Sequence, residues 1–298
     1  MNDHQIPFCH RKEEPEKSTL YIVGTPIGNL NDFSPRAVNI LKKVSFIACE
    51  DTRNTKKLLN FFNIKNRLIC LNQYNIKDKI NYVISELKVE KSIAIVSDAG
   101  MPLISDPGEL LVKEIKNNNF DAICIPGPCA ALTALVSSGC SCSRFIFYGF
   151  LPRSNKAKLE ILNDICKSQF TSIIYESPKR IIKLLQDLEK ICGYSREISL
   201  LKELTKKYEQ HLGNTIGEVL KHFDKFEPKG EFTLVISGNK NSKILGDDDL
   251  SIIKDDLKDL IKAGLSHSSA SIYLSKKYNK PKKVVYNLLI NKNLNFYK

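Results

Sequence analysis

The sequence Ile93-Ala94-Ile95-Val96-Ser97-Asp98-Ala99-Gly100-Met101-Pro102-Leu103-Ile104-Ser105-Asp106-Pro107-Gly108 begins as a β-branched run and continues as a turn-rich loop. The run predicts a buried strand, and the loop carries two aspartates, two prolines and two glycines. Loops at the carboxyl ends of strands carry the ligand chemistry of α/β proteins. We therefore expect residues 97–108 to form part of a ligand site, with Asp106 as N-cap and Pro107 as first residue of the following helix.

The same alternation of short apolar strands and amphipathic helices extends on both sides of this loop. It is typical of βαβ units and a mostly parallel sheet. Ser34 and Pro35 provide an N-cap and a first residue for one helix, and a second helix is predicted over 52–62. The other strands expected in this half are 20–23, 46–49, 68–71 and 122–125.

The second half begins with a helix of small apolar residues at 130–136 and continues as a mixed α/β pattern. The strands expected there are 145–148, 172–175, 197–201 and 232–237, and the helices are 156–166 and 178–190. A polar, acidic stretch at 239–249 is typical of a linker, and helical stretches follow at 250–263, 268–278 and 282–291. The predicted organisation is a disordered N-terminal tail (1–17), an N-terminal α/β domain (18–135), a C-terminal α/β domain (136–240) and a small helical, lysine-rich domain (250–298).

The charge of the chain fits a polyanionic partner. Its 298 residues carry a net charge of +12, and residues 262–298 contain eight lysines and no acidic residue. A lysine-rich composition alone would give the same charge. The last two helices have helix-turn-helix proportions, which favours nucleic-acid contact over a small solvated cap.

Neither a secretory signal nor a membrane span is expected, because the first seventeen residues are polar and no apolar run approaches the length of a membrane helix. We therefore expect a cytoplasmic protein. The nine cysteines form no CxxC pair, which predicts free, mostly buried thiols in a reducing compartment. His4, Cys9 and His10 could bind a metal, but no metal site is predicted.

Two further loops are expected beside residues 97–108. Gly24-Thr25-Pro26-Ile27-Gly28-Asn29 follows the first strand and matches neither a dinucleotide fingerprint nor a Walker A motif. Pro126-Gly127-Pro128-Cys129-Ala130-Ala131 is a tight turn that leads into a helix of small residues. Each could serve packing alone, but three such loops at the ends of strands in one sheet predict a cleft.

Charged residues also follow two strands. Glu50, Asp51 and Arg53 could orient a ribose or a phosphate, or Asp51 could cap a helix with Arg53 in solvent. Lys202 and Glu203 form a second mixed-charge strand end. The histidines lie outside all of these loops, which argues against a hydrolase triad.

These segments together resemble the tetrapyrrole methylase superfamily and, within it, the methyltransferases of the small ribosomal subunit RNA. The resemblance spans roughly residues 18–292. The matching motifs are 23–30, 50–53, 97–108, 126–130, 148–152, 175–177, 202–206 and 230–232.

The resemblance implies an α/β fold of two α/β domains that bind S-adenosylmethionine in the cleft between them, a small C-terminal helical domain, and a homodimer. It implies 2′-O-methylation of a decoding-region cytidine of 16S rRNA in the small ribosomal subunit, position 1402 in bacterial numbering. Met101 stands where the family usually has threonine. The cofactor-binding residues expected from it are Gly24, Thr25, Pro26, Ile27, Gly28, Asp98, Ala99, Gly100, Ile104, Ser105, Asp106, Gly127, Pro128, Ala130, Ala131 and Leu204.

Methyl transfer to a ribose hydroxyl requires removal of its proton. We hypothesise that Glu203, Glu50 or Asp51 is the base, and that Arg53 and Lys202 hold neighbouring phosphates. The alternatives are carbon methylation of a tetrapyrrole on the same fold, or a DNA-binding regulator that senses a small molecule.

Overall fold

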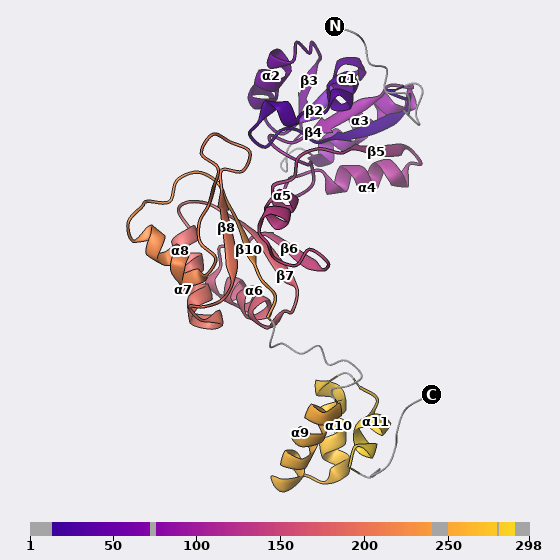
Figure 1. The fold of residues 1–298 in the computed structure, drawn as a ribbon. Helices are drawn as coiled ribbons and strands as arrows, with labels where there is room; N and C mark the ends of the chain where they lie inside the picture. The colour runs from indigo at the N-terminus through magenta and orange to yellow at the C-terminus, as the bar shows by residue number, and fades with distance from the viewer. Residues whose placement is uncertain (1–13, 72–75, 240–249, 279, 290–298) are drawn as a thin grey trace. The chain divides into compact units, whose positions relative to one another are not determined.

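The computed structural model describes residues 14–71, 76–239, 250–278 and 280–289 (Figure 1). The chain divides into two compact units, Met1–Gly238 and Asn239–Lys298. The first unit contains two five-stranded sheets, and the second contains helices. This arrangement matches the predicted fold class of two α/β sheets followed by C-terminal helices.

The first sheet is entirely parallel, with strand order β3-β2-β4-β1-β5. Parallel strands place all their carboxyl ends at one edge, so the loops after β1, β4 and β5 leave from neighbouring positions. The strands are β1 (Thr19–Val23), β2 (Phe46–Cys49), β3 (Leu68–Cys70), β4 (Ile93–Val96) and β5 (Asp121–Ile125).

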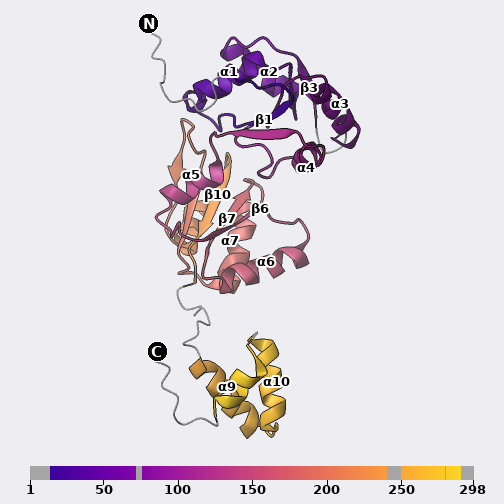
Figure 2. The same cartoon turned by 90° about the vertical axis from the view of Figure 1, so that its right-hand side faces the viewer.

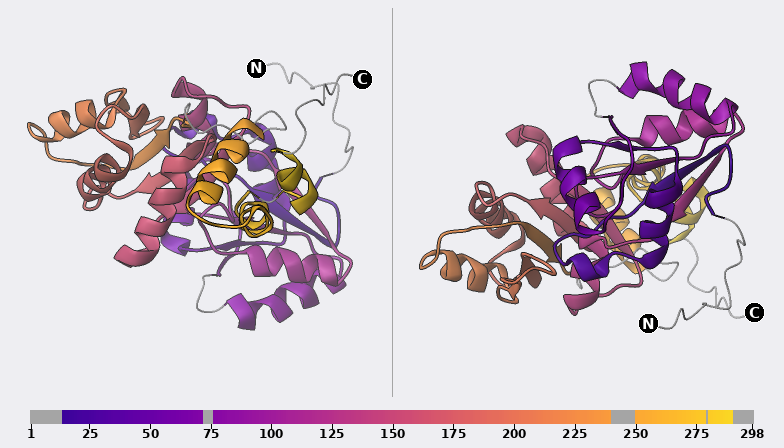
Figure 3. Two further views of the ribbon diagram at one scale, coloured as in Figure 1. Left: turned by 90° about the horizontal axis from the view of Figure 1, so that it is seen from below. Right: turned by 90° about the horizontal axis from the view of Figure 1, so that it is seen from above.

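Helices cover both faces of this sheet (Figure 3). Ala37, Ile40 and Leu41 of one helix are fully buried against one face, and this helix begins as predicted, with Ser34 as N-cap and a proline in its first turn. The helices of this half are α1 (Pro35–Lys43), α2 (Thr52–Phe61), α3 (Ile76–Lys88) and α4 (Glu109–Asn117), with a 3-10 turn η1 (Leu30–Asp32).

The second sheet is mixed, with strand order β6-β7-β10-β8-β9. Only β6 and β7 are parallel, and β10 is antiparallel to both of its neighbours. One face packs against three helices in the largest apolar cluster of the described chain. The elements are β6 (Phe145–Phe150), β7 (Thr171–Glu176), β8 (Ile198–Lys202), β9 (Gln210–His211), β10 (Phe232–Ile236), α6 (Asn155–Lys167), α7 (Ile181–Cys192) and α8 (Ile216–Phe223).

The helix α5 (Ala130–Ser137) packs on the second sheet, although it follows the last strand of the first (Figure 2). Ala131, Ala134 and Leu135 are buried in a cluster with Ile173 of β7 and Val235 of β10. The expected boundary after residue 135 therefore separates this helix from the sheet that buries its apolar face.

Two predicted helix starts are wrong. The helix α4 begins at Glu109 with Gly108 as N-cap, so Asp106 and Pro107 lie in the preceding loop. The backbone at Gly108 has a φ of +134°, which a side chain would disfavour, and the turns before it delay the helix. The helix α7 begins at Ile181 because residues 177–180 form a turn.

The second unit packs three short helices around Ile253, Leu257, Ala270, Leu274 and Val285. No helix among the described residues is long and apolar enough to span a membrane. The helices are α9 (Leu250–Lys262), α10 (His267–Lys277) and α11 (Lys282–Asn287).

Two sequence expectations concern the N-terminus and the thiols. Glu14, within the predicted disordered tail, forms an ion pair with Arg36 at 2.5 Å, while the possible metal ligands His4, Cys9 and His10 lie outside the described residues. The expectation of mostly buried thiols is wrong for the described cysteines. Only Cys49 is buried, while Cys124 and Cys142 are exposed, because short strands and helix ends carry most of these residues.

Candidate active site

The loops after β1, β4 and β5 are held together by their backbones. Thr25 and Gly100 exchange two backbone hydrogen bonds, at 2.8 and 3.1 Å. Gly24 and Gly127 pack so closely that a Cβ on Gly24 would lie 2.7 Å from the Cα of Gly127. Glycine is therefore required there for close approach, and the loops form one surface at the sheet edge.

The loop from Ser97 to Gly108 is a chain of turns. Gly100, Leu103 and Ser105 all have positive φ, at +81°, +72° and +67°. A Cβ on Gly149 of β6 would lie 2.8 Å from the Ser105 hydroxyl oxygen, so this loop also touches the second sheet. The loop thus bridges the two sheets of the first unit.

A cavity of about 380 Å³ opens between this loop and the ends of β7 and β10. Eight of the predicted cofactor-binding residues line it: Ile27, Asp98, Ala99, Gly100, Ile104, Ser105, Asp106 and Ala130. Its other lining residues are Met101, Cys129, Phe150, Tyr175, Glu176, Ser177, Pro178, Glu231, Phe232 and Thr233.

The cavity lining is acidic, although the whole chain is basic. The lining includes Asp98, Asp106, Glu176 and Glu231 and no lysine, arginine or histidine. Glu176 pairs with Arg180 at 3.3 Å and Glu231 with Lys206 at 2.8 Å, so Asp98 and Asp106 are the lining acids that form no ion pair with a described residue. Its apolar part is formed by residues such as Ile27, and the exposed Phe150 and half-buried Tyr175 rings stand 5.6 Å apart beside it. The arrangement suits a cationic ligand that also carries a flat ring.

Asp106 of the cavity lining has a raised pKa. Burial raises the pKa of its carboxyl from 3.8 to about 6, helped by the charges of Glu50 and Asp98 and opposed by a hydrogen bond from Ser97. Burial likewise raises the pKa of the Tyr175 phenol. Acidic groups that repel one another in this way are stabilised by a bound cation.

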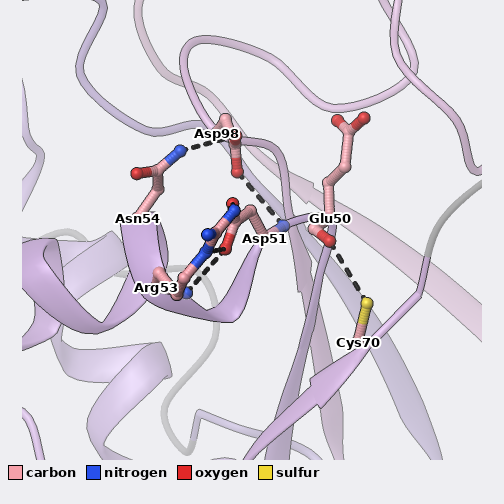
Figure 4. Close-up of polar contacts among 6 residues, drawn as sticks. All are labelled: Glu50, Asp51, Arg53, Asn54, Cys70 and Asp98. Carbon is pink, nitrogen blue, oxygen red and sulfur yellow. Dashed lines mark hydrogen bonds and ion pairs between the residues drawn. The ribbon is translucent and has the colours of Figure 1, made fainter.

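The charged residues after β2 make separate sets of contacts (Figure 4). Asp51 caps α2, and its carboxylate accepts hydrogen bonds from Arg53, which hold its pKa at about 2. Asp98 accepts from the backbone N–H of Asp51 at 3.3 Å and from Asn54 at 2.9 Å. Arg53 is largely exposed, so this helix start has the capped geometry that the sequence left open.

Glu50 points away from this pair (Figure 4). Its carboxylate forms no hydrogen bond or ion pair with a described side chain. Burial, and then the charges of Asp98 and Asp51, raise the pKa of Glu50. Its charge in turn acts on Asp106, so Glu50 lies within electrostatic reach of the cavity.

Lys202 and Glu203 lie outside the cavity lining. The Glu203 carboxylate accepts from the backbone N–H of Glu231 at 2.9 Å and pairs with Lys206 at 3.1 Å. Burial alone would raise the pKa of Glu203, but these donors hold it below its ordinary value. Lys202 lines a separate cavity beside β10.

Half of the predicted cofactor-binding residues lie outside the cavity lining. Thr25 is buried, Ala131 donates its backbone N–H to the Tyr175 hydroxyl at 2.9 Å, and Leu204 belongs to the apolar cluster beneath α5. The residues outside the lining are Gly24, Thr25, Pro26, Gly28, Gly127, Pro128, Ala131 and Leu204.

The cavity residues that were not among the predicted cofactor-binding residues come mainly from the second sheet. Tyr175 and Glu176 end a strand, so their position gave a signal that a cleft could include them. Glu231 belongs to the matching motif 230–232, but its position at the start of a strand gave no signal of a cleft, and Thr233 gave no signal at all, because β10 is antiparallel and contributes its beginning rather than its end to the cavity.

Comparisons with known proteins agree with the resemblance seen in the sequence. Residues 19–220 match the model of the tetrapyrrole (corrin/porphyrin) methylases. The chain is 39% identical to the ribosomal RNA small subunit methyltransferase I of Synechocystis, over 90% of this chain and 96% of the relative. It is 42% identical to the enzyme of that name from Thermotoga maritima, over 74% of this chain and 99% of the relative.

Among solved structures, a cobalt precorrin-4 methyltransferase of cobalamin biosynthesis superposes with a TM-score of 0.56. It covers 74% of this chain and 95% of its own, at 13% identity. This likeness is one of fold. The relatives at about 40% identity are what distinguish this chain within the fold.

Proposed function

The chain belongs to the ribosomal RNA small subunit methyltransferase I family of the tetrapyrrole methylases, and on this basis we propose its reaction in detail. It transfers a methyl group from S-adenosylmethionine to the 2′ hydroxyl of a decoding-region cytidine, position 1402, in 16S rRNA. A ribosomal substrate implies action in the cytoplasm. The identity of about 40% to rRNA enzymes favours this reaction over tetrapyrrole methylation, because the cobalt precorrin-4 methyltransferase is only 13% identical to this chain.

The observation that carries the proposal is the acidic cavity in a basic protein. S-adenosylmethionine bears a positive sulfonium and a positive ammonium beside a flat adenine. Asp98 and Asp106, the lining acids that form no ion pair with a described residue, suit the positive groups, and the apolar wall with Phe150 and Tyr175 suits the ring. The cavity volume of about 380 Å³ lies in the range of small-molecule sites.

The residues proposed to hold the cosubstrate are those that line the cavity and those that stand behind them. When bound, S-adenosylmethionine supplies an electrophilic methyl group. The protein positions the ribose hydroxyl for in-line attack and accepts its proton. Because the carboxylates of Asp51 and Glu203 are both hydrogen bonded within the protein, Glu50 is the base that we favour. Arg53 and Lys202 remain the proposed contacts to neighbouring phosphates.

We also propose a homodimer, and the absence of metal from the reaction. The exposed apolar side chains of α5 and the start of β6 support self-association. Leu132 and Val136 are 49% and 76% exposed and lie one turn apart on the same face of α5, and Phe145 is 40% exposed.

A cavity-filling variant tests the site. Ala130→Phe places a ring in the lining and should abolish binding of S-adenosylmethionine in titration calorimetry, together with methyl transfer to undermethylated small ribosomal subunits. Ala157→Phe, an equally half-buried alanine in the first turn of α6, is the control. Equal binding by wild type and Ala130→Phe would contradict the proposed site, and absence of transfer by wild type would contradict the function.

A further inference from the structure

A second cavity lies on the opposite side of β10 from the first. It measures about 460 Å³, and both cavities have Phe232 among their lining residues. Phe232 is the cross-strand partner of Lys202 on β8 and of Glu176 on β7. Lys202 belongs to the second cavity and Glu176 to the first. A molecule in the second cavity would therefore lie next to the proposed methyl-transfer site.

The second cavity combines an aromatic surface with an apolar floor. Phe226 is 59% exposed and stacks on His222, with ring centroids 4.8 Å apart and an angle of 30°. The floor is formed by Leu212, Phe223 and Phe232. An exposed ring beside such a floor is a surface on which a nucleobase can stack.

Cations surround this aromatic surface. Lys202 and Lys225 form no ion pair with a described residue, and Lys229 has only the loose, exposed contact of 3.6 Å with Glu227. Gln210 adds a side-chain amide to the rim, which can donate to or accept from a base edge. The first cavity has the opposite charge, so the two sites suit ligands of opposite sign.

The rim is held in place by the turn that follows α8. The backbone N–H groups of Lys225 and Phe226 both donate to the His222 carbonyl at 3.1 Å. At the other end of the turn, Gly230 has a φ of +89° and packs on the Glu203 side chain. Glu203 is thus a positioning residue for this loop, which explains why its carboxylate is engaged.

We propose that this cavity, defined by Lys202, Gln210, His222, Lys225, Phe226 and Lys229, binds one unpaired nucleotide of the RNA substrate next to the methylated one. The base stacks on Phe226, and the lysines contact its flanking phosphates. The proposal rests on the proposed function for the nature of the RNA, and it adds a subsite that binds single-stranded RNA without contacting the methyl donor.

The test measures binding of a fluorescein-labelled, single-stranded RNA ten-mer to the full chain. Fluorescence anisotropy reports the binding at several salt concentrations. Phe226→Ala should weaken binding by about 5- to 150-fold, the range for loss of one base stack. Phe226→Tyr should restore it, because the ring is kept. Phe61→Ala, at a ring that is 63% exposed on α2, is the matched control and should bind as wild type does.

The lysines give a second, independent readout. Lys225→Ala combined with Lys229→Ala should lower the slope of log affinity against log salt by about 1.4, since each phosphate contact to a single strand contributes about 0.7. Lys113→Ala with Lys116→Ala, two exposed lysines of α4, should leave the slope unchanged.

Unchanged affinity in Phe226→Ala and an unchanged slope in the lysine variant would overturn the subsite, as would failure of wild type to bind the ten-mer. Methyl transfer by wild type, measured on the same preparations, reports on the proposed function. Transfer without any effect of these variants would mean that the function stands and the subsite does not.

Discussion

Among the three candidate bases, Glu50 is the one whose carboxylate no described side chain engages. Glu50→Gln should lower the turnover number by about 10²- to 10⁴-fold at saturating S-adenosylmethionine and leave its affinity within twofold. Asp51→Asn keeps a side chain that can cap α2, and Glu203→Gln keeps an acceptor for the turn, so both should lose less than tenfold. Single-turnover rates on small subunits measure this, and loss of less than tenfold in Glu50→Gln would refute its role.

Asp106 should make stability depend on pH. Its folded pKa of about 6 exceeds the ordinary 3.8, so between these values the folded chain binds a proton that the unfolded chain has released. The free energy of unfolding therefore falls as pH rises through this window. Asp106→Asn should unfold about 2 °C above wild type at pH 7.5 and at the same temperature at pH 4. Exposed Asp121→Asn is the control, and a difference independent of pH would contradict this assignment.

At the scale of elements, α5 joins the two sheets of the first unit. Its N-cap residue Cys129 provides no side-chain hydrogen bond, and the Tyr175 hydroxyl from β7 accepts from Ala131 instead. Tyr175→Phe leaves this buried N–H without an acceptor and should cost about 1–3 kcal/mol in the free energy of unfolding. Urea unfolding would measure it beside Tyr208→Phe, whose ring is 66% exposed. Equal stability of the two variants would exclude a capping role for Tyr175.

Some of these elements are predictable from the sequence, and others are not. Periodicity and capping residues predict all five strands of the first sheet and the start of α1, because the strands are short apolar runs and Ser34 is a strong N-cap. The start of α4 was misplaced because Asp106 and Pro107 look like a helix start, while positive φ at Leu103 and Ser105 is a property of the folded loop. The short strand β9 carries no apolar pattern that could reveal it.

The candidate site was predictable only where it follows strand ends. Glu176 and Glu231 reach the lining because antiparallel pairing of β7 and β10 brings them to one edge from positions far apart in the chain. The second cavity depends on the turn after α8, which packs on the Glu203 side chain at Gly230. No local pattern encodes either juxtaposition, because both result from tertiary pairing.

At the scale of the molecule, we expect that binding of S-adenosylmethionine does not require the C-terminal unit. The relative from Thermotoga maritima aligns over 99% of its length while leaving a quarter of this chain unmatched. A variant ending at Gly238 should bind S-adenosylmethionine as the full chain does, and its KM for small subunits should rise about tenfold because lysine contacts to phosphate are lost. Calorimetry and initial rates test this. Loss of cosubstrate binding, or an unchanged KM, would contradict this division of labour.

Ribose methylation of 16S rRNA is tested by mapping the methylated product. Undermethylated small subunits are incubated with the protein and S-adenosylmethionine, and 2′-O-methyl groups are located by reverse transcription at limiting nucleotide concentration. We expect one new stop, at the decoding-region cytidine, that Ala130→Phe does not produce. A methyl group on a base or at another nucleotide would contradict the proposed reaction, as would the absence of any RNA methylation.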